Sequence, residues 1–206
     1  IPRRLIQAFL AAEDTAFFDH DGIDPKGVLR AALVNLRAGR VRQGASTITQ
    51  QLAKQMLVRT IGYAKGTERG LGRKIREAIL ARRLEYTLSK EDILYLYLNE
   101  IYLGAGVYGV QAAAESYFGK NVEDLSLGEM SLLAGLPPAP SRFSPIKNPK
   151  AARVKQAYVL RRMVEEGFIT AKEMKAAKAE EAEKKVQSKE NLFADVAPYF
   201  TEHVRR

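Results

Sequence analysis

The chain has 206 residues, of which 46% are hydrophobic and 28% charged, so it has the size and composition of one globular unit with a sizeable core. It contains no cysteine, which excludes disulfides and thiolate metal sites, and its 2 histidines are too few and too far apart for a zinc centre. The formal net charge of +9 favours an anionic partner, and leaves nucleic acid, an acidic lipid surface and a phosphorylated substrate open.

Apolar residues recur at spacings of three and four through most of the chain, and strand signals are nearly missing, which predicts an all-α fold. Helix start signals support this reading, since Asp24 precedes Pro25 and Gly39 follows the same apolar pattern. Capping boxes begin at Thr47, Ser126 and Thr170. The predicted helices cover residues 3–17, 25–38, 47–60, 73–88, 90–103, 109–118, 127–135, 150–166 and 171–186.

Two stretches between these helices are predicted to be non-helical. Residues 61–72 contain four glycines and are expected to be mobile, whereas the proline-rich residues 136–140 form a stiff turn. We expect one folded domain over residues 1–186 and a linker over residues 187–206. No apolar run reaches the roughly 18 residues that span a bilayer, so an anchor helix would lie outside this chain, which we interpret as a piece of a longer protein.

The first predicted helix carries an acid on its apolar face. Glu13 follows Ile6 by one heptad and lies on the stripe marked by Leu10 and Phe17. Apolar surroundings disfavour the charged form of a carboxylate, so Glu13 is a candidate general base. A glutamate at a helix end, paired with a nearby arginine, is the alternative. His20, in the polar turn that follows, is interpreted as a structural hydrogen-bonding residue.

Two further segments have the features of an anion-binding site. Residues 44–51 are small and rich in hydroxyls, and they approach a helix start whose free N–H groups and dipole attract negative charge, with Lys54 one turn beyond Gln50. A capped helix without a ligand is the alternative. At the start of the next helix and just before it, four cations surround Glu77, which is the arrangement of a pyrophosphate site or of a surface salt-bridge cluster. These cations are Arg69, Arg73, Lys74 and Arg76.

Five motifs in this order resemble the family 51 glycosyltransferase domains of class A penicillin-binding proteins and of monofunctional peptidoglycan transglycosylases. They are Glu13-Asp14-x-x-Phe17-x-x-His20-x-Gly22, Gly44-x-Ser46-Thr47-x-Thr49-Gln50-Gln51, Arg73-Lys74-x-x-Glu77, Lys90-x-x-Ile93-Leu94-x-x-Tyr97-Leu98-Asn99 and Leu133-Ala134-Gly135-Leu136-Pro137. The resemblance covers nearly the whole chain, from Ile1 to about Ala182.

The resemblance implies a lysozyme-like fold of two lobes, a larger head and a smaller apolar jaw near residues 28–68 that faces the bilayer. It places the domain on the outer face of a bacterial membrane, as a target of moenomycin-type inhibitors. Residues 187–206 would then lead toward a possible transpeptidase domain. The implied partners are lipid II, the growing glycan, the membrane surface and other cell-wall synthesis proteins, with no nucleic acid.

The resemblance also implies the chemistry. Glu13 would deprotonate the 4-hydroxyl of lipid II as this oxygen attacks the growing glycan, so that a β(1→4) bond forms with inversion and undecaprenyl pyrophosphate leaves. Glu77 is assigned to the catalytic centre as the residue that orients the cations, with Mg²⁺ as an optional ion and no required cofactor. The residues assigned to substrate and pyrophosphate are Asp14, Ser46, Thr47, Gln50, Gln51, Lys54, Arg69, Arg73, Lys74 and Asn99.

Two rival functions remain open on the sequence. A lysozyme-like muramidase or lytic transglycosylase would use Glu13 and Glu77 as an acid and base pair. A basic helical module would bind an anionic partner without catalysis, although its basic residues are dispersed along the chain.

Overall fold

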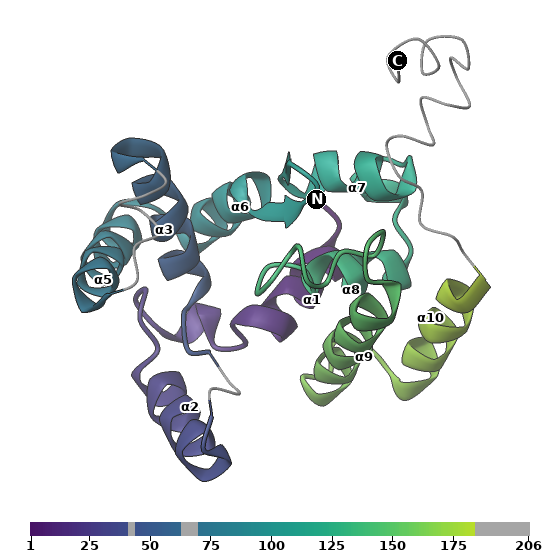
Figure 1. Ribbon diagram of the computed structural model, residues 1–206, viewed down its shortest axis with the longest axis horizontal. Coiled ribbons are helices and arrows are strands. Elements are labelled where there is room, and N and C mark those ends of the chain that lie inside the picture. The colour runs from purple at the N-terminus through teal and green to yellow at the C-terminus, as the bar shows by residue number, and fades with distance from the viewer. Residues whose placement is uncertain (41–43, 63–69, 184–206) are drawn as a thin grey trace, which may run out of the picture. The chain divides into compact units, whose positions relative to one another are not determined.

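The computed structural model describes residues 1–40, 44–62 and 70–183 (Figure 1). These residues are mostly helical, with nine α-helices, two 3-10 helices and a two-stranded sheet. The chain divides into two compact units, which we describe separately: Glu13–Ile101, and Ile1–Ala12 together with Tyr102–Arg206. The predicted linker at 187–206 and most of the glycine-containing stretch at 61–72 lie outside the described residues.

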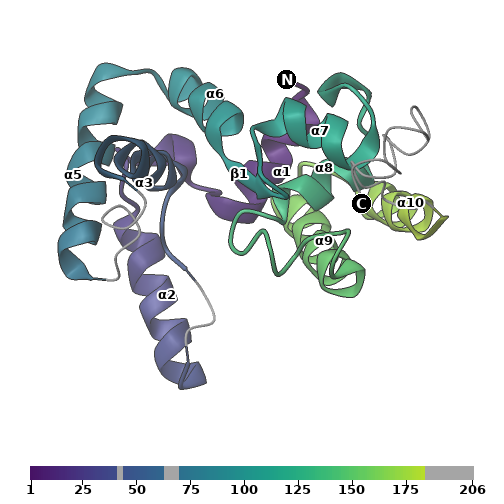
Figure 2. The ribbon, with the colours of Figure 1, turned by 45° about the horizontal axis from the view of Figure 1, so that its top comes forward.

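The unit Glu13–Ile101 is built on helix α3, which packs against α5 and α6. Figure 2 shows α3 and α5 side by side. Gly22 brings the loop before α2 against α5, because a Cβ at this position would lie 3.0 Å from Ala81 O and from Glu85 Cγ. The helices of this unit are η1 (Phe17–Asp19), α2 (Pro25–Ala38), α3 (Ile48–Ile61), α5 (Leu71–Thr87) and α6 (Lys90–Glu100).

The other unit packs α8 against α9 and α10, with α7 beside the small sheet. Its core includes the fully buried side chains of Tyr117 and Leu133. Its elements are the first twelve residues with most of α1 (Arg3–Glu13), then β1 (Tyr102–Gly104), β2 (Val107–Tyr108), α7 (Val110–Phe118), η2 (Val122–Asp124), α8 (Leu127–Ala134), α9 (Pro149–Glu165) and α10 (Ala171–Glu183).

The capping boxes predicted at Thr47, Ser126 and Thr170 are confirmed by reciprocal hydrogen bonds. A further box was missed, in which Ser89 caps α6 together with Asp92. It escaped prediction because aspartate replaces the glutamate or glutamine of the usual pattern. The turn expected at 136–140 is confirmed as non-helical.

The first predicted helix is too long, since α1 ends at Glu13 rather than at residue 17. The chain leaves the α-helical path here because the side chain of Asp14 binds the backbone amide of Ile48. It continues in a 3-10 turn, in which Phe17 N donates to Asp14 O at 3.2 Å. This early end frees the side chains from Asp14 to His20 for contacts with other helices.

Over the described residues the all-α prediction holds except at one short hairpin, where a helix was predicted as far as residue 103. Instead α6 ends at Glu100, and β1 pairs with β2 in antiparallel fashion. The turn between them requires positive φ at Gly104, Ala105 and Gly106, which a helix excludes. Tyr117 supports the hairpin by donating its hydroxyl to Leu103 O at 2.8 Å.

We expect Gly22→Ala to lower the free energy of unfolding by about 1–3 kcal/mol, because its φ is +84° and the new Cβ would collide with α5. Gly72→Ala, inside α5, is the matched control. Its Cβ would meet only the end of the Arg76 side chain at 3.9 Å, so it should be neutral or stabilise by about 0.5–1 kcal/mol. Urea unfolding of both variants measures the difference, and equal stability would contradict this role of Gly22.

Candidate active site

The predicted base is held by a neighbouring amide. The half-buried Glu13 ends α1, and its Oε2 accepts a hydrogen bond from Gln51 Nε2 at 2.8 Å. Gln51 Oε1 in turn accepts from the hydroxyl of Tyr97 on α6, at 3.3 Å. Gln51, which the sequence assigned to the substrate, therefore contacts the acid itself.

Asp14 ties the end of α1 to the start of α3. Its Oδ2 accepts from Ile48 N at 3.0 Å, and both of its carboxylate oxygens lie 3.1 Å from His20 Nε2. Ile48 is the first residue of α3, so its amide has no acceptor within the helix, and a negative charge is favourable at this end. Asp14 was assigned to substrate binding, but its 7% exposure and these partners describe a buried helix cap.

The hydroxyl of Thr47 also fixes the start of α3. It accepts from Gln50 N at 3.1 Å and donates to Gly22 O at 2.7 Å, so the start of α3 is fixed on both sides. Gln50 completes the capping box by accepting from Thr47 N at 3.1 Å. The structure thus uses Thr47 and Gln50 to set the direction of α3, a role the sequence suggested only through the capping pattern.

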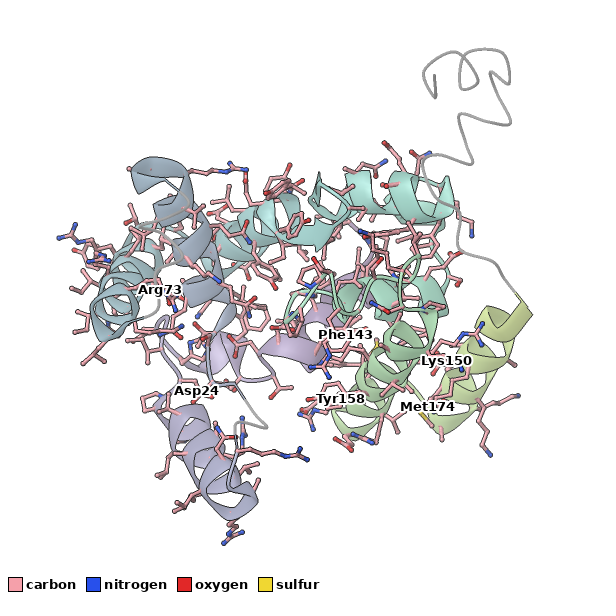
Figure 3. The ribbon with its side chains drawn as sticks, viewed as in Figure 1. Asp24, Arg73, Phe143, Lys150, Tyr158 and Met174 are labelled. Carbon is pink, nitrogen blue, oxygen red and sulfur yellow. The ribbon has the colours of Figure 1, made fainter. Side chains whose placement is uncertain are left out.

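Two of the predicted cations gather around Glu77 on α5 (Figure 3, where Arg73 is labelled). Glu77 is fully buried and forms ion pairs with Arg73 and with Lys74, whose Nζ lies 2.7 Å from Glu77 Oε2. Lys74 Nζ also donates to Ser46 Oγ at 3.0 Å, which joins this cluster to the segment before α3. The Lys74 side chain stays 45% exposed, so an anion in solvent can reach it.

The remaining predicted site residues that the structure describes take no part in the hydrogen bonds and ion pairs given above. Lys54 and Arg76 are exposed on α3 and α5. Asn99 is exposed and donates to Tyr95 O of its own helix at 2.8 Å. Arg69 lies outside the described residues.

A structural network that the sequence did not predict joins the first, second and fourth motifs. Glu85 Oε1 accepts from Thr49 Oγ1 at 2.6 Å and from Lys90 Nζ at 2.9 Å. Lys90 also donates to His20 O and lies 4.5 Å from the centre of the Phe17 ring. Glu85 stands outside all five motifs, so no sequence pattern pointed to it as the shared partner.

Burial and the charges near Glu13 keep the hydroxyl proton of Tyr97 in place. Burial, and then the negative charges of Glu13 and Asp14, raise the pKa of Tyr97 well above its ordinary value of 10.0. The phenol therefore remains a hydrogen-bond donor at neutral pH. Within residues 1–40, 44–62 and 70–183, no three His, Cys, Asp or Glu side chains gather in a way that could hold a metal ion.

Comparison with known proteins gives this geometry its context. A family model described as Transglycosylase matches residues 1–164. The chain belongs to this family. The membership predicted from the five motifs is thus confirmed, and the chain is a peptidoglycan transglycosylase domain of the kind found in class A penicillin-binding proteins.

Relatives of this transglycosylase domain are long proteins. Over 86% of the present chain, the sequence is 52% identical to penicillin-binding protein 1A of Aquifex aeolicus. Over 100% of the present chain, it is 46% identical to penicillin-binding protein 1A of Escherichia coli. It spans 23% of each of these relatives. A crystal structure of penicillin-binding protein 1A from Haemophilus influenzae is 34% identical, with a TM-score of 0.45, over 68% of this chain and 17% of that one.

We expect Glu77→Gln to lower the free energy of unfolding by about 2 kcal/mol, because it removes a charged acceptor and leaves Arg73 and Lys74 facing each other unbalanced. Glu91→Gln, at an exposed position on α6, is the control and should change stability little. Thermal unfolding followed by circular dichroism compares them. An unchanged midpoint for Glu77→Gln would show that the buried acid does not hold the cations together.

Proposed function

We propose that this domain polymerises lipid II into β(1→4)-linked glycan strands, with inversion at the anomeric carbon and release of undecaprenyl pyrophosphate. One observation carries the proposal: residues 46–51 contact both the acid and one of the cations, since Gln51 binds Glu13 and Ser46 binds Lys74. Thr47 and Gln51 are separated by one helical turn, about 6 Å along the axis. One short, well-capped segment therefore contacts both the proposed base and a proposed phosphate-binding cation.

Glu13 supplies the base in this proposal. The 4-hydroxyl oxygen of lipid II attacks the anomeric carbon of the growing glycan, the bond from that carbon to the pyrophosphate oxygen breaks, and Glu13 takes the hydroxyl proton. The hydrogen bond from Gln51 holds the Glu13 carboxylate in one orientation for this transfer. General base catalysis of this type contributes about 10²–10⁴-fold to a rate.

Arg73 and Lys74 supply the counter-charge for the leaving pyrophosphate. Glu77 holds both cations in place from the buried side, and this geometry supports the predicted role of Glu77 in orienting them. Fixed cations stabilise charge as it develops on the phosphate oxygens, without reorganisation during the step. A Mg²⁺ ion carried by the pyrophosphate remains an optional addition to this proposal.

The muramidase alternative fits the contacts less well. It requires a second carboxylate that can exchange protons with substrate or water. Glu77 is fully buried and is engaged by Arg73 and Lys74, so it is badly placed for that task.

We further propose that the predicted lysozyme-like fold has its membrane-facing jaw at residues 28–68, with α2 as the element that enters the bilayer surface. None of the helices among the described residues is long and apolar enough to cross a membrane. Yet α2 exposes several large apolar side chains, and the same helix carries one lysine and two arginines. This composition is typical of a helix that lies on an anionic lipid surface. The exposed apolar residues are Val28, Leu29, Leu33, Val34 and Leu36.

Glu13→Gln should abolish polymer formation from lipid II, because the amide cannot accept the hydroxyl proton, while the helical content of the domain stays unchanged. The loss should reach at least about 10²-fold in kcat. Gel analysis of glycan products from labelled lipid II measures it, with Glu91→Gln as the exposed control on α6. Polymerisation by Glu13→Gln at near the native rate would remove Glu13 from the role of base.

Replacing Leu29 and Leu33 together by serine should weaken binding to phosphatidylglycerol vesicles by at least about tenfold, because each buried leucine contributes roughly 1.5–3 kcal/mol. Val154→Ser, at a 73% exposed position on α9, is the matched control and should bind as the native chain does. Vesicle sedimentation measures both. Equal binding by all three proteins would argue against α2 as the docking element.

A further inference from the structure

Tyr97 hydrogen-bonds to the Gln51 amide, which in turn hydrogen-bonds to Glu13. Its side chain is fully buried in α6, and α6 packs directly on α3, which carries Gln51. The tyrosine hydroxyl donates to Gln51 Oε1 at 3.3 Å, and Gln51 Nε2 donates to Glu13 Oε2 at 2.8 Å. A continuous chain of donors thus runs from the core of this unit to the acid.

We propose that Tyr97 is a positioning residue for glycosyl transfer, which keeps the Gln51 amide turned so that its N–H, and not its carbonyl, faces Glu13. The proposal rests on the proposed function, in which Glu13 is the base. It also gives Gln51 a different task from the one the sequence suggested, since its amide would serve the acid rather than the sugar or phosphate.

The reason lies in the near symmetry of an amide. The oxygen and nitrogen of a glutamine side chain have almost the same size, so a half turn about the last side-chain bond exchanges them with little steric cost. With the oxygen turned toward Glu13, a lone pair would face an ionised carboxylate, and the hydrogen bond would become a repulsion. The charged carboxylate thus favours the orientation with the N–H toward it, and a fixed donor on the other side of the amide strengthens this preference before substrate binds.

A tyrosine hydroxyl can make this selection because it has one proton to give. The raised pKa of Tyr97 keeps that proton in place at neutral pH, so the phenol favours the amide oxygen as its acceptor. The ring is fully buried, with 0% exposure, so the packing of the core holds the hydroxyl in position. Gln51 then presents its N–H to Glu13 before substrate arrives, which is the preorganisation that proton transfer needs.

Tyr97→Phe tests the proposal, because it removes the hydroxyl and keeps the ring that fills the core. In lipid II polymerisation by the 206-residue chain, we expect kcat to fall about tenfold while KM stays unchanged, as for a residue that serves the transition state. Tyr95→Phe, two residues away on the same helix and 62% exposed, should retain the native kcat. Rates are expressed per folded molecule, from circular dichroism at the assay temperature.

A double-mutant cycle separates positioning from a general structural effect. If Tyr97 acts through the amide, adding Tyr97→Phe to Gln51→Leu should cost no further activity, because the orientation it controls no longer exists. Full additivity of the two losses would overturn the proposal, and so would a native kcat for Tyr97→Phe or a loss confined to KM. If Glu13→Gln is inactive while Tyr97→Phe is fully active, this inference alone fails. If Glu13→Gln keeps its activity, the proposed function fails first.

Discussion

The bond between the Asp14 carboxylate and the first amide of α3 is the contact on which the site depends. A helix start has unpaired N–H groups and a partial positive charge, and a buried acid satisfies both. Once α3 begins at this point, Gln51 lies against Glu13 and Ser46 lies within reach of Lys74. One capping interaction thereby brings the proposed base and one of the proposed phosphate-binding cations, Lys74, to the same helix start.

Burial divides the acids of this unit between structure and chemistry. Asp14, Glu77 and Glu85 are each enclosed by donors or cations, and each organises side chains around it. Glu13 is half-buried, and its carboxylate accepts a hydrogen bond from the Gln51 amide. This partial exposure suits the acid that must accept a proton from a substrate.

The sequence predicted the helices, three of the capping boxes and the family because these depend on local patterns and on ordered motifs. It did not predict that α1 would end at Glu13, since the reason is a hydrogen bond to Ile48, which is distant in sequence. The hairpin after α6 was missed because its turn depends on positive φ at consecutive residues rather than on strand periodicity. Glu85 was missed for a similar reason, as its partners come from other segments.

Amide hydrogen exchange at Ile48 tests the central capping contact most directly. The first amides of a helix have no intrahelical acceptor and ordinarily exchange quickly with solvent. If the Asp14 carboxylate holds this amide, Ile48 should be protected as strongly as Leu52, one turn further into α3. Exchange at Ile48 as fast as in an unfolded chain, with Leu52 still protected, would contradict the account of how this site is assembled.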